Sequence, residues 1–183
     1  MVNISQPFTY EEAFSRNLGW VTRDEQTRLR GSRVAIAGLG GVGGIHLTTL
    51  ARLGVEAFSV ADFDAFDVAN FNRQAGAFVS TLGQPKVDVM CEIARDINPG
   101  VAITSFPGGI DEGNVDDFLK DVNVYVDGLD YFAFSTRRLL YRKLEQKKIP
   151  AVIAAPLGMG VALVNILPGE MTFEEYFRLD GHS

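Results

Sequence analysis

The sequence has little cysteine or histidine and no excess of basic charge. Its 183 residues include one cysteine and two histidines, and the formal net charge is −6. A single cysteine excludes an internal disulfide and, because no charged and then apolar leader opens the chain, we expect a cytoplasmic protein. The acidic balance argues against nucleic acid as the main partner, since nucleic-acid-binding domains usually present a basic face.

Repeats, low-complexity runs and linkers that would divide the chain are also missing. With 46% hydrophobic residues the chain can bury one sizeable core, so we expect a single domain over residues 1–183. Within it we expect an N-terminal helical arm over 1–31, a core over 32–168 and a C-terminal helix over 169–183.

One long segment carries no charge. Residues 149–168 are 20 uncharged residues, which is the length of a membrane span. Prolines, glycines and an asparagine interrupt the segment, and its β-branched residues fall into two short clusters. This pattern predicts two buried core strands joined by a glycine loop, and no contact with a membrane.

Short apolar runs alternate with stretches of helical periodicity along the whole chain. Strands are predicted over 33–37, 57–61, 102–106, 122–127 and 151–155. Helices are predicted over 11–17, 24–30, 45–53, 86–98 and 134–148. Alternating strands and helices predict a doubly wound α/β fold with a mostly parallel sheet and a Rossmann-type core. In such a sheet the ligand binds beyond the carboxyl ends of the strands.

A glycine-rich turn follows the first core strand. Gly38, Gly40, Gly41 and Gly43 separate that strand from the helix predicted to begin near residue 45. Without Cβ atoms the backbone can approach a phosphate closely, and the first N–H groups of the helix face the anion. Taken alone this fingerprint is only moderately specific, because several classes of nucleotide-binding protein share it.

The residues after the turn narrow the choice of nucleotide. Asp62 ends the second predicted strand, about 20 residues past the turn, where a ribose-binding acid is expected. So far the pattern would suit NAD. A dinucleotide, however, needs no cluster of cations, whereas Arg73 and Lys86 follow, beside the polar residues Asn70 and Gln74. The cluster favours a triphosphate.

The order of these motifs resembles the ThiF/MoeB adenylyltransferases, which are relatives of the ubiquitin-activating enzymes. The resemblance covers nearly the whole chain, and in its overall appearance the chain is similar to a bacterial branch of ThiF-like proteins. The matching elements here are residues 38–43, Asp62 with Asp64, Asn70 with Arg73 and Gln74, residues 83–86, residues 127–130, residues 14–17, residues 155–158 and residues 171–177.

The resemblance implies ATP-dependent adenylation of a carboxylate, assisted by Mg²⁺ and with release of pyrophosphate. The substrate it implies is the C-terminus of a ubiquitin-like or sulfur-carrier protein. Asp62 would hold the ribose hydroxyls, Asp130 would bind the Mg²⁺, and the cations would contact the phosphates. The catalytic residues implied are Arg16, Arg73, Lys86 and Asp130, and the nucleotide-binding residues are Gly38, Gly40, Gly41, Gly43, Asp62, Asp64, Asn70, Arg73, Gln74 and Lys86.

Arg16 lies before the first core strand, and nothing in the local sequence places it near the glycine turn. On position alone it would be an ordinary solvated arginine. The resemblance implies instead that it crosses a two-fold interface and contacts the phosphates of the partner's ATP. We therefore expect a homodimer.

Other polar side chains have simpler interpretations. Asp130 could cap the helix near residue 134, and Arg73 and Lys86 taken singly could be solvated surface charges. Arg137 and Arg138 could reach the nucleotide, but on an amphipathic helix we expect them on the solvated face. Asp64 could merely solvate the strand end, and His46 receives no role. Cys91 is expected to be a small packed residue.

The chain departs from the family pattern at two places. The family often has asparagine directly after the metal-binding aspartate and an arginine about one turn later, whereas Tyr131 follows Asp130 here. The acceptor cysteine and the two Cys-x-x-Cys zinc pairs found in many members are also missing. Separately, the aromatic residues near the end of the chain need a packing partner, which we expect to be the sheet, a second subunit or a further segment.

Three other functions stay open. One is an ATP-dependent dehydratase that acts on modified transfer RNA, against which the acidic charge counts. The second is an NAD-binding oxidoreductase, which the cations disfavour. The third is a nucleotide-binding scaffold without catalysis.

Overall fold

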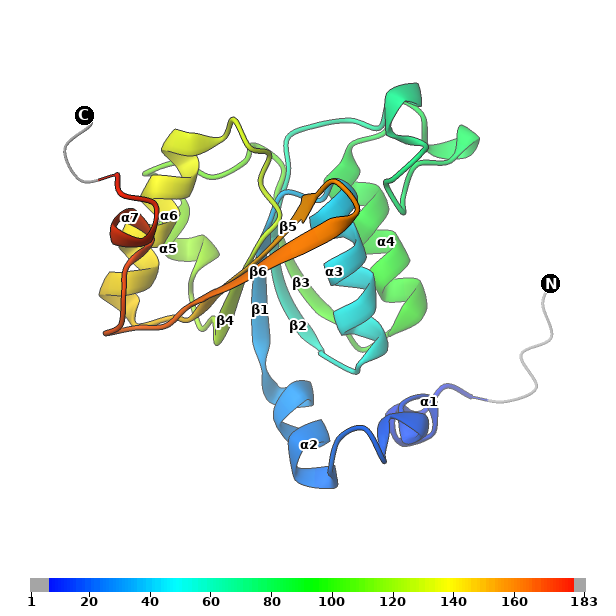
Figure 1. Cartoon of the computed structure of the whole chain (residues 1–183). Coiled ribbons are helices and arrows are strands. Elements are labelled where there is room, and N and C mark those ends of the chain that lie inside the picture. The colour runs from blue at the N-terminus through cyan, green and yellow to red at the C-terminus, as the bar shows by residue number, and fades with distance from the viewer. Residues whose placement is uncertain (1–6, 180–183) are drawn as a thin grey trace.

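A computed structural model describes residues 7–179, and its centre is a six-stranded sheet (Figure 1). The strand order is β3-β2-β1-β4-β5-β6, with β6 antiparallel to β5 and all other neighbours parallel. The strands are β1 (Arg33–Ala37), β2 (Ala57–Ala61), β3 (Ala102–Phe106), β4 (Val124–Asp127), β5 (Ala151–Leu157) and β6 (Gly160–Ile166).

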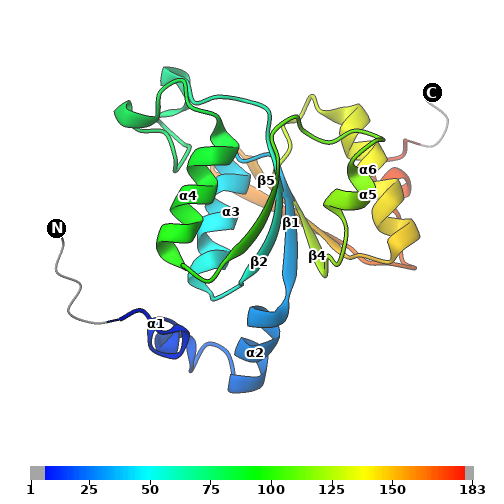
Figure 2. The ribbon, with the colours of Figure 1, turned by 180° about the vertical axis from the view of Figure 1, so that it is seen from behind.

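Helices cover both faces of the sheet (Figures 1 and 2). One face packs against α3 and α4, and the other packs against α5 and α6. The helices are α1 (Tyr10–Ala13), α2 (Arg23–Gly31), α3 (Gly41–Arg52), α4 (Lys86–Ile97), α5 (Val115–Phe118), α6 (Phe134–Lys147) and α7 (Phe173–Tyr176), with short 3₁₀ turns η1 (Ser15–Asn17), η2 (Val68–Asn70) and η3 (Val79–Thr81). This arrangement confirms the doubly wound α/β prediction.

Most predicted elements are present, with differences at their ends. β1, β2 and β3 have the predicted bounds. The fourth strand begins two residues later than expected, because the Val122 amide donates to the Leu119 carbonyl and closes the turn after α5. The single helix expected over 11–17 is instead α1 and η1, separated by the buried Phe14.

The uncharged segment 149–168 forms the antiparallel β5–β6 hairpin, as predicted. The expectation that both strands are buried is wrong. Val161 and Leu163 are 68% and 66% exposed, whereas Ile166 is buried against α6 and its neighbours. β6 is an edge strand whose alternate residues face opposite sides: Val164 and Ile166 pack into the core on the α5–α6 face, whereas Val161 and Leu163 lie exposed on the other face. No helix within residues 7–179 is long and apolar enough to cross a membrane.

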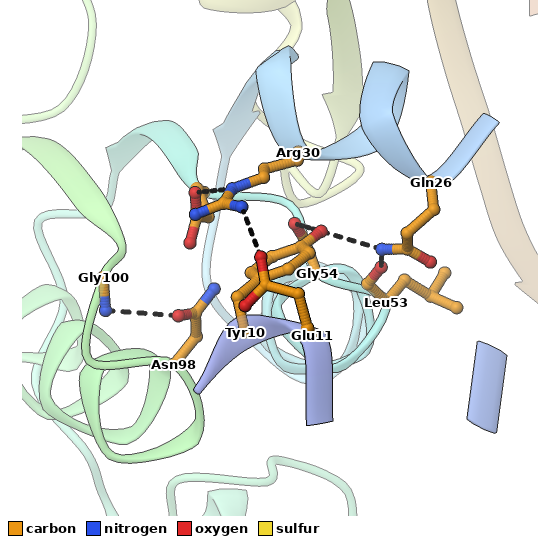
Figure 3. A network of polar contacts seen from close by, with 9 residues as sticks. Tyr10, Glu11, Gln26, Arg30, Leu53, Gly54, Asn98 and Gly100 are labelled. Atoms are coloured by element: carbon orange, nitrogen blue, oxygen red, sulfur yellow. Dashed lines mark hydrogen bonds and ion pairs between the residues drawn. The ribbon is translucent and has the colours of Figure 1, made fainter. Parts of the chain in front are cut away.

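The N-terminal arm packs at the end of α3 that lies away from the glycine turn. The Tyr10 hydroxyl donates to the Gly54 carbonyl, and the Gln26 amide donates to that hydroxyl and to the Leu53 carbonyl (Figure 3). Arg30 holds the carboxylates of Glu11 and Glu56 at 3.2 and 2.8 Å. These contacts attach α1 and α2 to the end of α3 and to the segment between α3 and β2, at the amino edge of the sheet (Figure 3).

The last described helix packs on its own chain. Thr172 and Glu175 form a capping box at the start of α7. The Phe173 ring stacks on Tyr141 of α6, with ring centroids 4.2 Å apart. Tyr176 and Phe177 remain about half exposed, at 49% and 46%. The buried aromatic at this end of the chain thus packs on α6 of the same chain, which was not among the three packing partners expected.

Candidate functional site

The glycine turn between β1 and α3 is tightly packed. Gly38 has φ +83°, a conformation that favours glycine, and a Cβ at this position would collide with the carbonyl oxygen of Gly128. The helix begins at Gly41, earlier than predicted, and a Cβ on Gly43 in its first turn would collide with the Gly38 carbonyl. The turn therefore requires glycine, and it brings the β1–α3 and β4–α6 loops into contact at the carboxyl edge of the sheet.

The helix that follows the turn begins without a side-chain cap. Its N-cap residue is Gly40, which has no side chain to accept hydrogen bonds from the N–H groups of the first turn. Those N–H groups and the positive end of the dipole of this 12-residue helix face the carboxyl edge of the sheet. This is the arrangement that binds a phosphate.

Asp62 connects the end of β2 to the glycine turn. Its Oδ2 accepts a 2.6 Å hydrogen bond from the Leu39 amide, and its Oδ1 accepts one of 2.8 Å from the Asp64 amide. The Leu39 amide is thus already bonded and is not open to a phosphate. A carboxylate offers about four lone-pair sites, so Asp62 keeps the capacity to accept from ribose hydroxyls.

Arg73 and Gln74 lie against the glycine turn, although they are more than 30 residues away in the chain. The Arg73 Cγ would be 3.4 Å from a Cβ on Gly41, and the Gln74 amide nitrogen 3.6 Å from one on Gly40. Gln74 is buried, and its Oε1 accepts no hydrogen bond within the described residues. The Arg73 guanidinium is exposed, held by the Ala69 carbonyl and the Asn72 side chain at 3.0 Å each.

Asn70 builds the turn that carries these two side chains. Its Oδ1 accepts from the Asp67 amide, and its carbonyl accepts from the amides of Arg73 and Gln74 at 3.2 and 3.0 Å. The structure thus gives Asn70 a local role in shaping this segment, in addition to the predicted contact with phosphate.

Lys86 is the first residue of α4, and it is not the solvated surface charge that its local sequence allowed. Its side chain is 7% exposed, and its Nζ lies 2.9 Å from Oδ2 of Asp64. The Lys86 amide also donates to the Asp64 carbonyl at 2.8 Å. Asp64 is itself half exposed, so it does more than solvate the strand end: it holds the lysine at the carboxyl edge of the sheet.

Asp130 lies in the β4–α6 loop with its side chain exposed. It is not the N-cap of α6, because that position is occupied by Ala133, which has no side-chain oxygen to accept from the first N–H groups. Its Oδ1 instead accepts a 3.1 Å hydrogen bond from the Phe132 amide. Within residues 7–179 no group of three or more acidic, histidine or cysteine side chains could hold a metal alone. A single carboxylate fits Mg²⁺ that is bound mainly by phosphates and water.

The expectation that Arg137 lies on a solvated face is wrong. Its side chain is 13% exposed and pairs with Asp127, the last residue of β4, at 2.8 Å. Burial lowers the pKa of Arg137, but the hydrogen bond and charge of Asp127 outweigh burial, so the net pKa is raised. An acid that ends a buried strand requires a partner, and this was the signal in the sequence for the pair. Arg138 is also paired, with Glu174 at 3.0 Å.

Three further residues lie away from the glycine turn or take no part in the site. Arg16 is exposed in η1, next to Asn17, whose side chain donates to the Leu53 carbonyl beyond the end of α3. Cys91 is buried in the core as expected, and burial raises the pKa of its thiol. His46 is partly buried, and burial lowers its pKa.

The glycine turn, the strand-end acid and the two cations beside them define a nucleotide-binding α/β domain. The chain belongs to the ThiF family, whose family model matches residues 14–181. It is 36% identical over 129 residues to the tRNA threonylcarbamoyladenosine dehydratase of Bacillus subtilis, covering 70% of this chain and 48% of that protein. It is 31% identical over 162 residues to the molybdopterin-synthase adenylyltransferase of Escherichia coli, covering 87% and 64%.

Solved structures with the same fold include a protein of almost the same name as one of the sequence relatives. The E. coli dehydratase in complex with ATP superposes with a TM-score of 0.75 at 25% identity, covering 83% of this chain and 62% of that one. PaaA superposes with a TM-score of 0.78 at 21% identity, covering 96% of this chain and 58% of that one, which shows a shared fold. The chain thus spans about half to two thirds of the length of these relatives.

Proposed function

We propose that this domain binds ATP and activates a carboxylate by adenylation. The observation that carries the proposal is the placement of Arg73 beside the uncapped start of α3, with the buried Lys86 held by Asp64 at the same edge of the sheet. Two cations near a phosphate-binding turn suit a triphosphate. Membership of the ThiF family, with adenylyltransferases among the relatives, favours this chemistry over hydride transfer with NAD.

The reaction needs positioning and charge neutralisation more than acid–base chemistry. A carboxylate oxygen attacks the α-phosphorus of ATP, the bond from that phosphorus to the bridging oxygen breaks, and pyrophosphate leaves with the electron pair. The nucleophile is already ionised at neutral pH, so no general base is required. Arg73 and Lys86 would neutralise charge on the phosphates, which is how preorganised cations lower such barriers.

Mg²⁺ would be held by the Asp130 carboxylate together with the phosphates of ATP. Bound there, the ion supplies further neutralisation of the phosphate charge. In this proposal Asp62 accepts from the ribose hydroxyls and the glycine turn contacts the phosphates through its N–H groups. Asn70 and Gln74 supply polar contacts beside the same turn.

The proposal extends to the acyl substrate and to the oligomeric state of the protein. We infer a ubiquitin-like or sulfur-carrier protein whose C-terminal carboxylate is activated, because relatives include a SAMP-activating enzyme E1 and molybdopterin-synthase adenylyltransferases. A homodimer would let Arg16 of one protomer reach the nucleotide of its partner. The buried free thiol of Cys91 suits a reducing cytoplasm.

ATP with Mg²⁺ is expected to stabilise the protein, and NAD is expected to leave its melting temperature unchanged. At ATP a hundredfold above its dissociation constant, the expected shift is about 5 to 10 °C. A thermal-shift titration with each nucleotide measures it, and Lys86→Ala should reduce the ATP shift. A shift with NAD and none with ATP would overturn the proposed function.

Cys91→Ser is expected to leave ATP–pyrophosphate exchange at the wild-type rate, because this buried core residue is no nucleophile in the proposed reaction. The variant should lose about 1 to 3 kcal/mol of unfolding free energy, because a hydroxyl is then buried among apolar side chains. Chemical denaturation and the exchange assay measure the two effects. Loss of exchange by a folded variant would identify Cys91 as part of the reaction.

A second candidate function is ATP-dependent dehydration of a modified transfer RNA. It is favoured by the 36% identity to the B. subtilis tRNA threonylcarbamoyladenosine dehydratase, whereas the net charge of −6 counts against RNA binding. Incubation with ATP and transfer RNA that carries threonylcarbamoyladenosine, followed by mass spectrometry of the nucleosides, tests it. Loss of one water from the modified nucleoside would establish this activity.

A further inference from the structure

The loop that carries Asp130 is tied down by one buried arginine. The Arg137 Nη2 donates to the carbonyls of Leu129 and Asp130 at 2.9 and 3.2 Å, and its Nε donates to the Asp127 carboxylate at 2.8 Å. A single guanidinium therefore connects the end of β4, the loop and the first turn of α6. A lysine could not make all of these hydrogen bonds, because its ammonium is a compact point charge and lacks the planar, forked donors of a guanidinium.

Asp127 is the fixed end of this connection. Its side chain is 1% exposed, and its Oδ1 accepts a 3.0 Å hydrogen bond from the Leu129 amide. Tyr125 and Tyr141 lie near it, and burial together with the charge of Asp127 raises the pKa of both hydroxyls. Both tyrosines thus stay neutral. A carboxylate in such an environment holds its guanidinium partner strongly, because removal of either partner leaves a buried charge unpaired.

Asp130 is held at two points. Its carbonyl accepts from Arg137, and its Oδ1 accepts from the Phe132 amide at 3.1 Å. The loop also touches the glycine turn: the Gly128 amide donates to the Ala37 carbonyl at 2.9 Å, and the Gly128 carbonyl packs on Gly38. The position of the Asp130 carboxylate relative to the phosphate-binding turn is therefore set through contacts that Asp127 and Arg137 complete.

We propose that Asp127 and Arg137 are a positioning pair that fixes the loop of residues 128–131 and orients the Asp130 carboxylate toward the nucleotide phosphates. This inference rests on the proposed function, because it takes Asp130 as the ligand of Mg²⁺. Neither residue touches the nucleotide in this account. Their effect is to keep the backbone on both sides of Asp130 in one conformation, so that the carboxylate need not be ordered when Mg²⁺ and ATP bind.

The test separates positioning from simple charge pairing. Arg137→Lys retains a cation for Asp127 but cannot also bind the loop carbonyls. We expect Arg137→Lys to keep a cooperative unfolding transition and to reduce the gain in ATP affinity that Mg²⁺ provides by about tenfold, measured by calorimetry with and without Mg²⁺. Asp130→Asn should lose the same gain. Arg142→Ala, an exposed arginine of the same helix, is the matched control and should retain it.

Amide hydrogen exchange measures how well the loop is ordered when no ligand is bound. In Arg137→Lys the amides of Leu129 and Phe132 should exchange at least about tenfold faster, the effect of losing a hydrogen bond to a charged group. Wild-type exchange at these amides and an unchanged Mg²⁺ effect would show that Arg137 only neutralises Asp127, and would overturn the proposal. If Asp130→Asn leaves the Mg²⁺ effect intact, the metal role assigned to Asp130 fails, and amide exchange alone then decides whether the pair orders the loop.

Discussion

Lys86→Ala is expected to slow ATP–pyrophosphate exchange by on the order of 10²-fold or more, the cost of removing one preorganised electrostatic group. The structure places the lysine as such a group requires. Its side chain is nearly buried, and Asp64 already holds the ammonium 2.9 Å away, so little ordering remains when the phosphates bind. Arg73→Ala should cost a similar factor, because its side chain lies against the start of α3.

The assay uses ATP, Mg²⁺, labelled pyrophosphate and purified ubiquitin-like or sulfur-carrier proteins as carboxylate substrates. Lys120→Ala provides the matched control, because Lys120 is exposed and precedes β4 at the amino edge of the sheet. It should exchange at the wild-type rate. The Lys86 variant should still fold, since Asp64 is 54% exposed and water can solvate it once the lysine is gone. Full exchange by folded variants of both Lys86 and Arg73 would refute the site assignment.

A mixture of inactive Arg16→Ala and inactive Lys86→Ala protein is expected to recover activity. Arg16 lies near the far end of α3, and a helix of 12 residues is about 18 Å long, so its guanidinium does not reach the glycine turn of its own chain. If Arg16 contacts ATP, it must do so in a second protomer, as an arginine finger supplied in trans does. A heterodimer of the two variants then holds one site with both native side chains.

The expected recovery has a definite size. With random exchange of subunits at equal concentrations, about half of the dimers are mixed and each has one complete site, which gives about a quarter of the wild-type rate per site. The control mixture replaces the Arg16 variant by the double variant Arg16→Ala/Lys86→Ala, which leaves no complete site in any dimer. An active monomer in sedimentation, or no recovery despite proven exchange, would leave Arg16 an ordinary surface side chain.

Much of the candidate site was predictable because its signals are local. A strand, a glycine turn and a helix in succession place phosphate-binding N–H groups whatever the rest of the chain does. Asp62 follows a strand that neighbours β1, so the order of elements alone brings it to the same edge of the sheet. The sequence could not show that Asp62 uses both of its carboxylate oxygens to hold the Leu39 and Asp64 amides.

The sequence by itself determined the alternation of strands and helices, the glycine turn and the ThiF family, because hydrophobic periodicity and backbone requirements act over a few residues. Only the tertiary structure decided which charges are buried and what they contact. Arg137 has the sequence pattern of a solvated helix residue, yet α6 packs so that it meets Asp127. Likewise, the β5–β6 hairpin carries no charge, but Val161 and Leu163 stay exposed because it is the opposite face of β6 that packs into the α5–α6 core. Such outcomes depend on how helices and strands pack against one another in three dimensions, which no local pattern specifies.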